Sequence, residues 1–122
     1  MNSRILSTLF LLSTLLIVGC DNPGEIRVRN SVSGAKIQNV RWGDVLIAGE
    51  LLPGEISNVV KIKDDPDWGV NLPAEEPLRF YLNVDGDLIF LETRAKYRLD
   101  EEVKLSLSIH DTTEVWNSIV ND

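Results

Sequence analysis

The sequence predicts an all-β protein, a single antiparallel β-sandwich. Three observations favour this fold class: apolar and polar residues alternate with a period of two along much of the chain, turn-forming residues separate the alternating segments, and helical spacing of apolar residues is poor after Cys20. Alternation of this kind places apolar side chains on one face of a strand and polar ones on the other. About seven or eight short strands in roughly a hundred residues favour a two-layer sandwich, with a small barrel as the alternative.

The alternating segments can be followed along the chain. In each of them apolar residues, with a few small or polar ones, share one face, and in most of them Arg, Lys or Ser takes the other. We expect each of the last two segments, which are the clearest, to form one strand. The shared-face positions are Ile26, Val28 and Asn30; Ile56, Val60 and Ile62; Thr93, Ala95, Tyr97 and Leu99; and Val103, Leu105, Leu107 and Ile109.

The Asp85-Gly86 pair is the strongest turn signal, because this dipeptide suits a two-residue hairpin turn. It predicts that segments 78–84 and 87–93 pair as a hairpin. The pattern resembles the immunoglobulin-like or transthyretin-like architecture, although the paired cysteines around a tryptophan that mark immunoglobulin domains are absent.

The register of this hairpin stays open between two alternatives. A two-residue loop pairs Leu82 with Ile89, whereas a three-residue loop that includes Asp87 pairs Leu82 with Phe90. A slip of one residue moves side chains to the opposite face of the sheet, so the two alternatives predict different cores.

The C-terminal segment 112–122 also has two alternatives. It could form one short helix, with Asp111 or Thr112 as the N-cap and with Val115 and Ile119 on one side. The competing prediction is an extended tail.

The first nineteen residues have the build of a secretory signal peptide. Arg4 supplies a short positive start, and residues 5–18 form an uncharged, largely apolar segment. As a helix this segment would be roughly 21 Å long, whereas the hydrocarbon core of a bilayer is about 30 Å thick. We therefore expect residues 1–19 to form a signal helix in the precursor only, rather than a permanent membrane span.

The end of this segment, Ile17-Val18-Gly19-Cys20, resembles the lipobox of bacterial lipoproteins. The resemblance implies that a diacylglycerol is attached to the Cys20 thiol and that a signal peptidase cuts before Cys20. It also implies that the new amino group can receive a further acyl chain, such as palmitate. Two or more chains hold a protein firmly on a membrane, because each buried CH₂ contributes about 0.8 kcal/mol. A plain signal peptide cut elsewhere and an uncleaved anchor are the alternatives.

The mature chain would contain one domain. Residues 20–24 would be the lipidated cysteine and a short tether, and residues 25–122 the sandwich. With 11 basic and 19 acidic residues the net charge is −8, which argues against nucleic acid as a partner and against electrostatic adhesion to anionic lipid. Cys20 is the only cysteine, so its lipidation excludes disulfides and thiol chemistry.

The expected location is the bacterial cell envelope, with the protein anchored in a membrane by lipid. Asp21, directly after the cysteine, resembles the signal that keeps enterobacterial lipoproteins in the inner membrane. The resemblance gives a slight preference for the inner membrane, and the outer membrane stays the alternative.

Acidic residues and the single histidine are the candidates for chemistry. Asp64, Asp65 and Asp67 form the densest acidic cluster, and carboxylate oxygens are ligands for Ca²⁺, but the spacing of an EF-hand loop is not met. A solvated loop is favoured, and a calcium site is the alternative. His110 is interpreted as a surface residue beside Asp111. No pattern indicates catalysis, so we expect a protein that is not an enzyme and has no cofactor besides its covalent lipid.

Trp68 and Trp42 are the candidate residues of a binding surface, because tryptophan is enriched at binding hot spots. Trp68 lies in a turn-rich acidic loop and could contact a protein or a glycan. The alternative is that each tryptophan ring fills one end of the sandwich.

Basic residues form a second candidate surface. A stripe on one sheet face could bind a polyanionic glycan or an acidic partner, although a solvated face paired with acidic neighbours is favoured. The residues of this candidate stripe are Arg94, Lys96, Arg98, Arg27 and Arg29.

The sequence thus predicts a membrane-anchored lipoprotein of the cell envelope that acts as a protein- or glycan-binding module. One alternative is a structural or assembly subunit of an envelope or fimbrial machine that completes or donates a strand. A small hydrolase or a calcium-dependent domain is the other alternative.

Overall fold

The computed structural model describes residues 22–117 apart from Pro66 and Trp68. This part of the chain contains ten strands and no helix, which confirms the all-β fold class. Accordingly, it has no helix long and apolar enough to cross a membrane. The signal peptide predicted at residues 1–19 and the Cys20 anchor lie outside the described residues. The strands are β1 Gly24–Ser31, β2 Lys36–Trp42, β3 Val45–Leu51, β4 Val60–Ile62, β5 Ala74–Glu76, β6 Leu78–Val84, β7 Asp87–Thr93, β8 Tyr97–Leu99, β9 Lys104–His110 and β10 Val115–Asn117.

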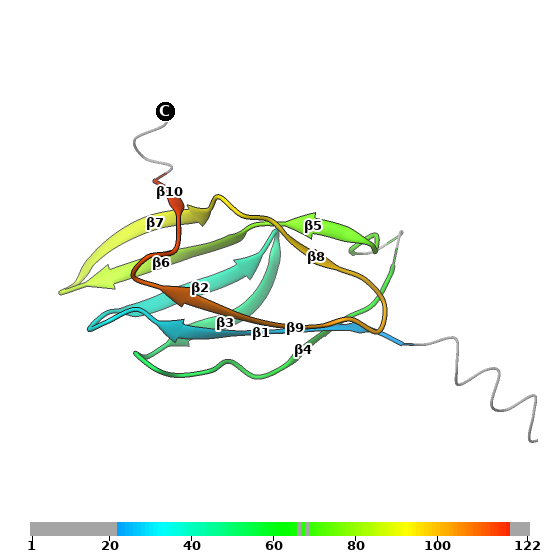
Figure 1. Cartoon of the computed structure of the whole chain (residues 1–122), viewed down its shortest axis with the longest axis horizontal. Coiled ribbons are helices and arrows are strands. Elements are labelled where there is room, and N and C mark those ends of the chain that lie inside the picture. Colours follow the sequence, from blue (N-terminus) through cyan, green and yellow to red (C-terminus); the bar gives the residue numbers. More distant parts are fainter. Residues whose placement is uncertain (1–21, 66, 68, 118–122) are drawn as a thin grey trace, which may run out of the picture.

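The strands form a two-layer sandwich (Figure 1). The smaller sheet has the order β4-β1-β9, and the larger sheet has the order β10-β7-β6-β2-β3. β5 and β8 form a separate two-stranded sheet. Within the described residues both sheets end in free edges and do not close into a barrel, so the sandwich prediction is confirmed.

β1 lies at the centre of the smaller sheet and pairs in both directions. It runs antiparallel to β4, with Gly24 opposite Ile62, and parallel to β9, with Glu25 opposite Lys104. The named strand pairs of the other two sheets are antiparallel. A parallel pair needs a long connection, and the chain from β2 to β8 supplies it. The sandwich is therefore antiparallel except for this one pair.

The core lies between the two sheets and follows the period-two pattern of the sequence. On β1, Ile26, Val28 and Asn30 are buried, whereas Arg27 and Arg29 are exposed. Packing these apolar faces against each other removes them from water, which is the main favourable contribution to folding. The most deeply buried apolar side chains are Ile26, Val28, Ile37, Val40, Trp42, Leu78, Phe80, Leu99 and Ile109.

β6 and β7 form the hairpin predicted at Asp85-Gly86. The loop has two residues, and Leu82 pairs with Ile89, which selects the first of the two registers. Asp85 and Gly86 have φ angles of 52° and 91°, the positive values that a type I′ turn requires at both positions. The Gly86 N–H donates a hydrogen bond to Asn83 Oδ1 at 3.0 Å, which closes the turn.

The alternating segment 93–99 is two strands, so the prediction of one strand is wrong. β7 ends at Thr93, the chain bends, and β8 begins at Tyr97 in a different sheet. The Thr93 hydroxyl accepts a hydrogen bond from the Leu78 N–H at 2.9 Å and donates one to the Ala95 carbonyl at 2.9 Å. This buried hydroxyl satisfies the backbone where the ladder stops, and the chain can turn away there.

The described part of the C-terminal segment is extended. Val115–Asn117 is β10, which pairs antiparallel with β7. The helix alternative is therefore wrong for residues 112–117. The Arg94 N–H donates to the Glu114 carbonyl at 3.0 Å and so joins the segment to the end of β7. Residues 118–122 lie outside the described residues.

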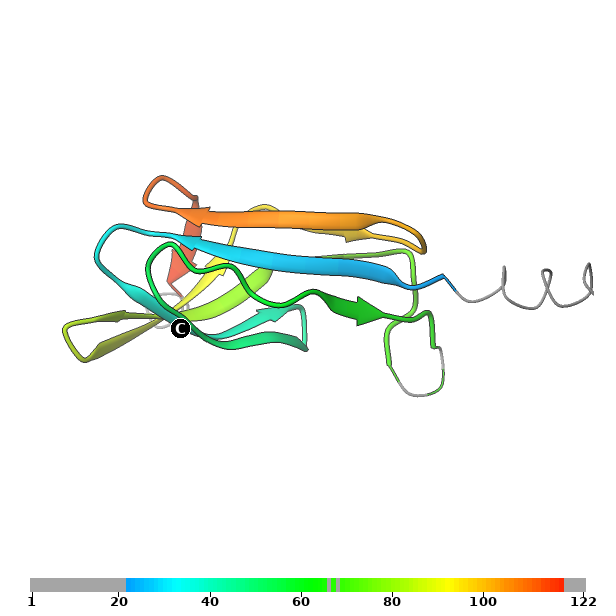
Figure 2. The ribbon, with the colours of Figure 1, turned by 90° about the horizontal axis from the view of Figure 1, so that it is seen from below.

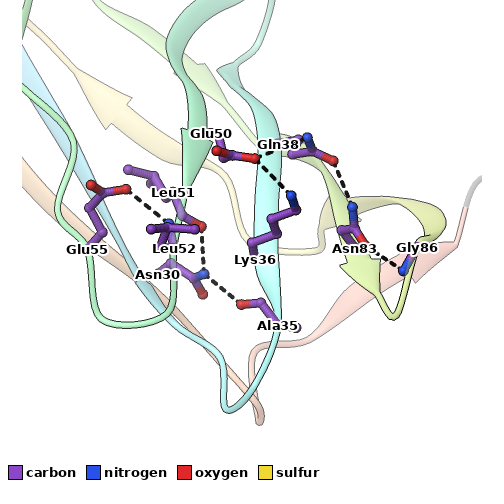
Figure 3. Close-up of polar contacts among 10 residues, drawn as sticks. All are labelled: Asn30, Ala35, Lys36, Gln38, Glu50, Leu51, Leu52, Glu55, Asn83 and Gly86. Atoms are coloured by element: carbon purple, nitrogen blue, oxygen red, sulfur yellow. Dashed lines mark hydrogen bonds and ion pairs between the residues drawn. The ribbon is translucent and has the colours of Figure 1, made fainter.

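Asn30 is a fully buried polar residue that joins three segments of the chain. Its side-chain nitrogen donates to the carbonyls of Ala35 at 2.8 Å and Leu51 at 2.9 Å (Figure 3). Its Oδ1 accepts from the Val32 N–H at 3.0 Å, and its backbone N–H donates to the Glu55 carbonyl at 2.9 Å. The end of β1 is thereby fixed to the start of β2 and the end of β3.

Candidate functional site

Of the two tryptophans proposed as a binding surface, the structure describes only Trp42. Trp42 is only 1% exposed, and its indole N–H donates to the Tyr97 carbonyl at 3.0 Å. The expectation that Trp42 lies on a contact surface is wrong, because the ring fills the core and links β2 to β8. Trp68 lies outside the described residues.

The acidic cluster stabilises its own loop. Asp64 Oδ1 accepts a hydrogen bond from the Leu72 N–H at 2.9 Å, and Asp65 Oδ1 accepts one from the Asp67 N–H at 3.1 Å. Among the residues that the structure describes, no group of three His, Cys, Asp or Glu side chains could hold a metal ion. Two of the three carboxylates are thus engaged with backbone amides.

The basic residues of the candidate stripe are spread over separate parts of the fold. Arg94 lies in the bend after β7, with its guanidinium 3.9 Å from the centre of the Trp116 ring. Arg98 lies on β8 and pairs with Asp100 at 3.8 Å. Arg27 lies on β1 in another sheet. These side chains do not share one strand face, as the sequence pattern had suggested.

The outer face of the larger sheet carries a network of paired polar side chains. Lys36 forms an ion pair with Glu50 at 3.1 Å, and Gln38 accepts a hydrogen bond from Asn83 at 3.2 Å (Figure 3). On the same face, Arg79 Nε donates to Glu92 at 2.7 Å, and this hydrogen bond raises the pKa of Arg79. The polar side chains named here therefore have partners within the chain.

β9, in contrast, is an edge strand. In the described part of the chain it pairs with β1 alone, over the whole length from Lys104 to His110. Figure 2 shows β9 at the outer margin of the smaller sheet, beyond β1. Edge strands of this length present a row of backbone groups that another strand can bind.

The hydrogen-bonding pattern identifies which backbone groups of β9 face outward. The Glu25 N–H donates to the Val103 carbonyl at 2.8 Å, while Glu25 lies opposite Lys104. In a parallel ladder, alternate residues bond to the neighbouring strand, so the odd-numbered residues of this segment face β1. The N–H and C=O groups of Lys104, Ser106 and Ser108 therefore face away from the sheet.

The last outward residue, His110, has a backbone partner in the loop that follows. Its N–H donates to Thr113 Oγ1 at 2.8 Å, and its carbonyl accepts from the Thr113 N–H at 3.1 Å. Asp111 fixes the same loop, because its carboxylate accepts from the Ser33 N–H at 2.8 Å, and this bond lowers the pKa of Asp111. The open part of the edge thus ends at Ser108.

Apolar side chains beneath this edge are only partly covered. Leu105 and Leu107 point toward the core from β9 but stay half-buried. At the end of β9 a hollow of about 180 Å³ opens between the layers. Its apolar lining includes Val32, Phe80, Leu82, Leu91, Ile109 and Val115.

Sequence reasoning identified the faces of β9 but missed its position. The alternation correctly predicted that Ser106 and Ser108 lie on the polar face. The edge position follows from the pairing of β9 with β1 alone. This pairing brings Arg27 Nε within 3.2 Å of Ser106 Oγ. No local signal in the sequence carries this information.

No protein-family model, curated protein or solved structure matches this chain.

Proposed function

We propose that this chain is a lipoprotein of the bacterial cell envelope, anchored by lipid on Cys20, that binds a protein partner as an additional strand along β9. The open edge of the seven-residue strand β9, from Lys104 to Ser108, carries the proposal. It offers both chemical components of strand addition, namely unpaired backbone groups and apolar side chains beneath them.

The anchoring part of the proposal is supported by the lipobox-like Ile17-Val18-Gly19-Cys20 after a charged start and an apolar segment. β1 begins at Gly24, so three residues separate the cysteine from the first strand. At about 3.5 Å per residue these residues span little more than 10 Å. The sandwich would therefore act close to the membrane surface.

A protein strand fits this edge better than a glycan does. The outward backbone groups of Lys104, Ser106 and Ser108 alternate donors and acceptors at the spacing of a second strand. The half-buried Leu105 and Leu107 would be covered by apolar side chains of that strand, which a sugar cannot supply. Backbone pairing would give affinity, and the side chains beneath it specificity.

The experiment replaces Ser106 with cysteine in the full-length, membrane-bound protein. The Ser106→Cys thiol would carry a photo-activatable cross-linker, because Cys20 is the only natural cysteine and lipid occupies it in the proposal. We expect illumination of native membranes to give a discrete, larger protein adduct. Wild-type protein, which has no free thiol, should give none.

The matched control is Asn58→Cys, an exposed position just before β4, on the opposite side of the smaller sheet. Its label should give no discrete adduct. Absence of an adduct from Ser106→Cys, or an equal adduct from Asn58→Cys, would show that β9 is not a binding edge.

A further inference from the structure

We infer that the strand added along β9 is β9 of a second copy of this chain, antiparallel to the first and related to it by a two-fold axis at Ser106. The inference rests on the proposed function and deepens it, because it names the partner of the same edge. Two features carry it: the register that satisfies the open backbone groups and the side chains that this register brings together.

The backbone selects the register. Two antiparallel strands bond fully when residues with outward N–H and C=O groups lie directly opposite each other. With Ser106 opposite Ser106, Lys104 lies opposite Ser108 at both ends, and every open group of these residues has a partner. With the axis at Leu105, Ser108 of each strand would lie opposite a residue before β9 and lack a strand partner. With the axis at Leu107, Lys104 would lie opposite His110, whose backbone groups are already bonded to Thr113.

The inner side chains are self-complementary in this register. Leu105 of one copy lies opposite Leu107 of the other, and Val103 lies opposite Ile109. All four point toward the core, and Leu105, Leu107 and Val103 are only partly buried in the single chain. Pairing would extend the apolar layer across the axis and bring Val103 of the second copy to the hollow beside Ile109.

The outer side chains are compatible with the same register. Serine meets serine at the axis, and the one charged side chain named beside Ser106, Arg27, reaches its hydroxyl from β1, the strand on the other flank of β9. Each Lys104 lies opposite Ser108, and the two ammonium groups stay separated along the strands. A register centred on Lys104 would place them face to face, which is unfavourable. Lys104 therefore restricts the alternatives without closing the edge.

The membrane supplies the concentration that this contact needs. One strand pair buries less area than the roughly 1,200 Å² of a stable complex, so free chains in solution would pair weakly. Anchors in one bilayer confine the copies to a thin layer and raise their effective concentration. We therefore expect pairing of the lipidated protein in membranes.

The test uses two full-length chains with different tags, one with Ser106→Lys and the other with Ser106→Glu, produced together. Ser106 is exposed on the outer face, so both variants should fold. At the two-fold axis the two new side chains would lie opposite each other. A zero-length carbodiimide, applied to membranes, should link the two tagged chains, and mass spectrometry should locate the bond at position 106 in both.

The control shifts the charges by two residues. A Ser108→Lys chain with a Ser108→Glu chain should give at least a roughly fivefold lower yield of linkage between the substituted positions, since Ser108 faces Lys104 in the proposed register. Equal linkage from both pairs, or none from the Ser106 pair, would overturn the inference. If the Ser106→Cys label still captured a different protein, the proposed function would stand without the second copy. If it captured nothing, both would fail.

Discussion

Asn30 shows how much of this fold depends on one amide group. It lies at the end of β1, fully buried, and its side chain bonds to three backbone groups from other parts of the chain. The bonds to the carbonyls of Ala35 and Leu51 are buried, so these two carbonyls could not reach water in its place without opening this end of the sandwich. A buried polar group is tolerated here because both side-chain N–H groups and the side-chain oxygen have hydrogen-bond partners.

We expect Asn30→Ala to lower the free energy of unfolding by about 2–3 kcal/mol, because it leaves buried backbone groups without partners. Urea denaturation of the detergent-solubilised protein, followed by tryptophan fluorescence, would measure the loss. Asn58→Ala is the control: Asn58 is exposed, and the change should stay within about 0.5 kcal/mol. A similar effect of the two substitutions would contradict the bonding role of Asn30.

At the scale of elements, the β6–β7 hairpin depends on the backbone conformation of its turn. Gly86 has a φ of 91°, and a Cβ atom added there would meet no other atom within 4 Å. A Cβ atom added at Gly49 on β3 would also meet open space, but the φ of Gly49 is not positive. Because neither position is crowded, a comparison of alanine at Gly86 with alanine at Gly49 measures the effect of backbone strain alone.

We expect Gly86→Ala to destabilise the protein by about 1–2 kcal/mol, the cost of a left-handed conformation for a residue with a Cβ atom. Gly49→Ala should be neutral or stabilise by up to about 1 kcal/mol, because it reduces the freedom of the unfolded chain. Thermal melts of both variants beside the wild type would test this pair. Equal melting temperatures would argue against a strained turn.

The same hairpin shows what the sequence could predict. Asp85-Gly86 and the alternation on either side located β6 and β7 correctly, because turn chemistry and period are local properties. The break after Thr93 was missed, because alternation continues through it and the hydrogen bonds of the buried Thr93 hydroxyl at the end of β7 leave no mark on the sequence pattern. The parallel pairing of β1 with β9 was missed too, since it joins residues 79 positions apart. The open edge of β9 depends on that pairing, so it could not be predicted from the sequence either.

At the scale of the whole molecule, the proposed lipid attachment does not depend on the charge of the chain. The mature chain predicted from the sequence has 11 basic and 19 acidic residues, so its charge of −8 gives it no electrostatic affinity for anionic lipid. In the proposed function the lipids on Cys20 alone hold the protein on the membrane. Two or more acyl chains are enough for stable anchoring.

We expect Cys20→Ser to move the protein from the membrane fraction to the soluble fraction and to abolish incorporation of labelled palmitate. Flotation of membranes on a density gradient would measure the first effect, and gel autoradiography the second. Wild-type protein should float and carry the label. A Cys20→Ser protein that stays firmly bound and is still cleaved would disprove lipid attachment at this residue.

The parallel alignment of β1 and β9 has a consequence for orientation. The Glu25 N–H bonds to the Val103 carbonyl, so the start of β1, which would be the lipid-proximal end in the proposed function, lies beside the start of β9 in the same chain. In the inferred antiparallel pair, the two lipid-proximal ends would leave one continuous six-stranded sheet in opposite directions. Both acyl groups could then enter one leaflet only if the strands ran along the bilayer, so the pair would rest flat on the membrane instead of standing upright.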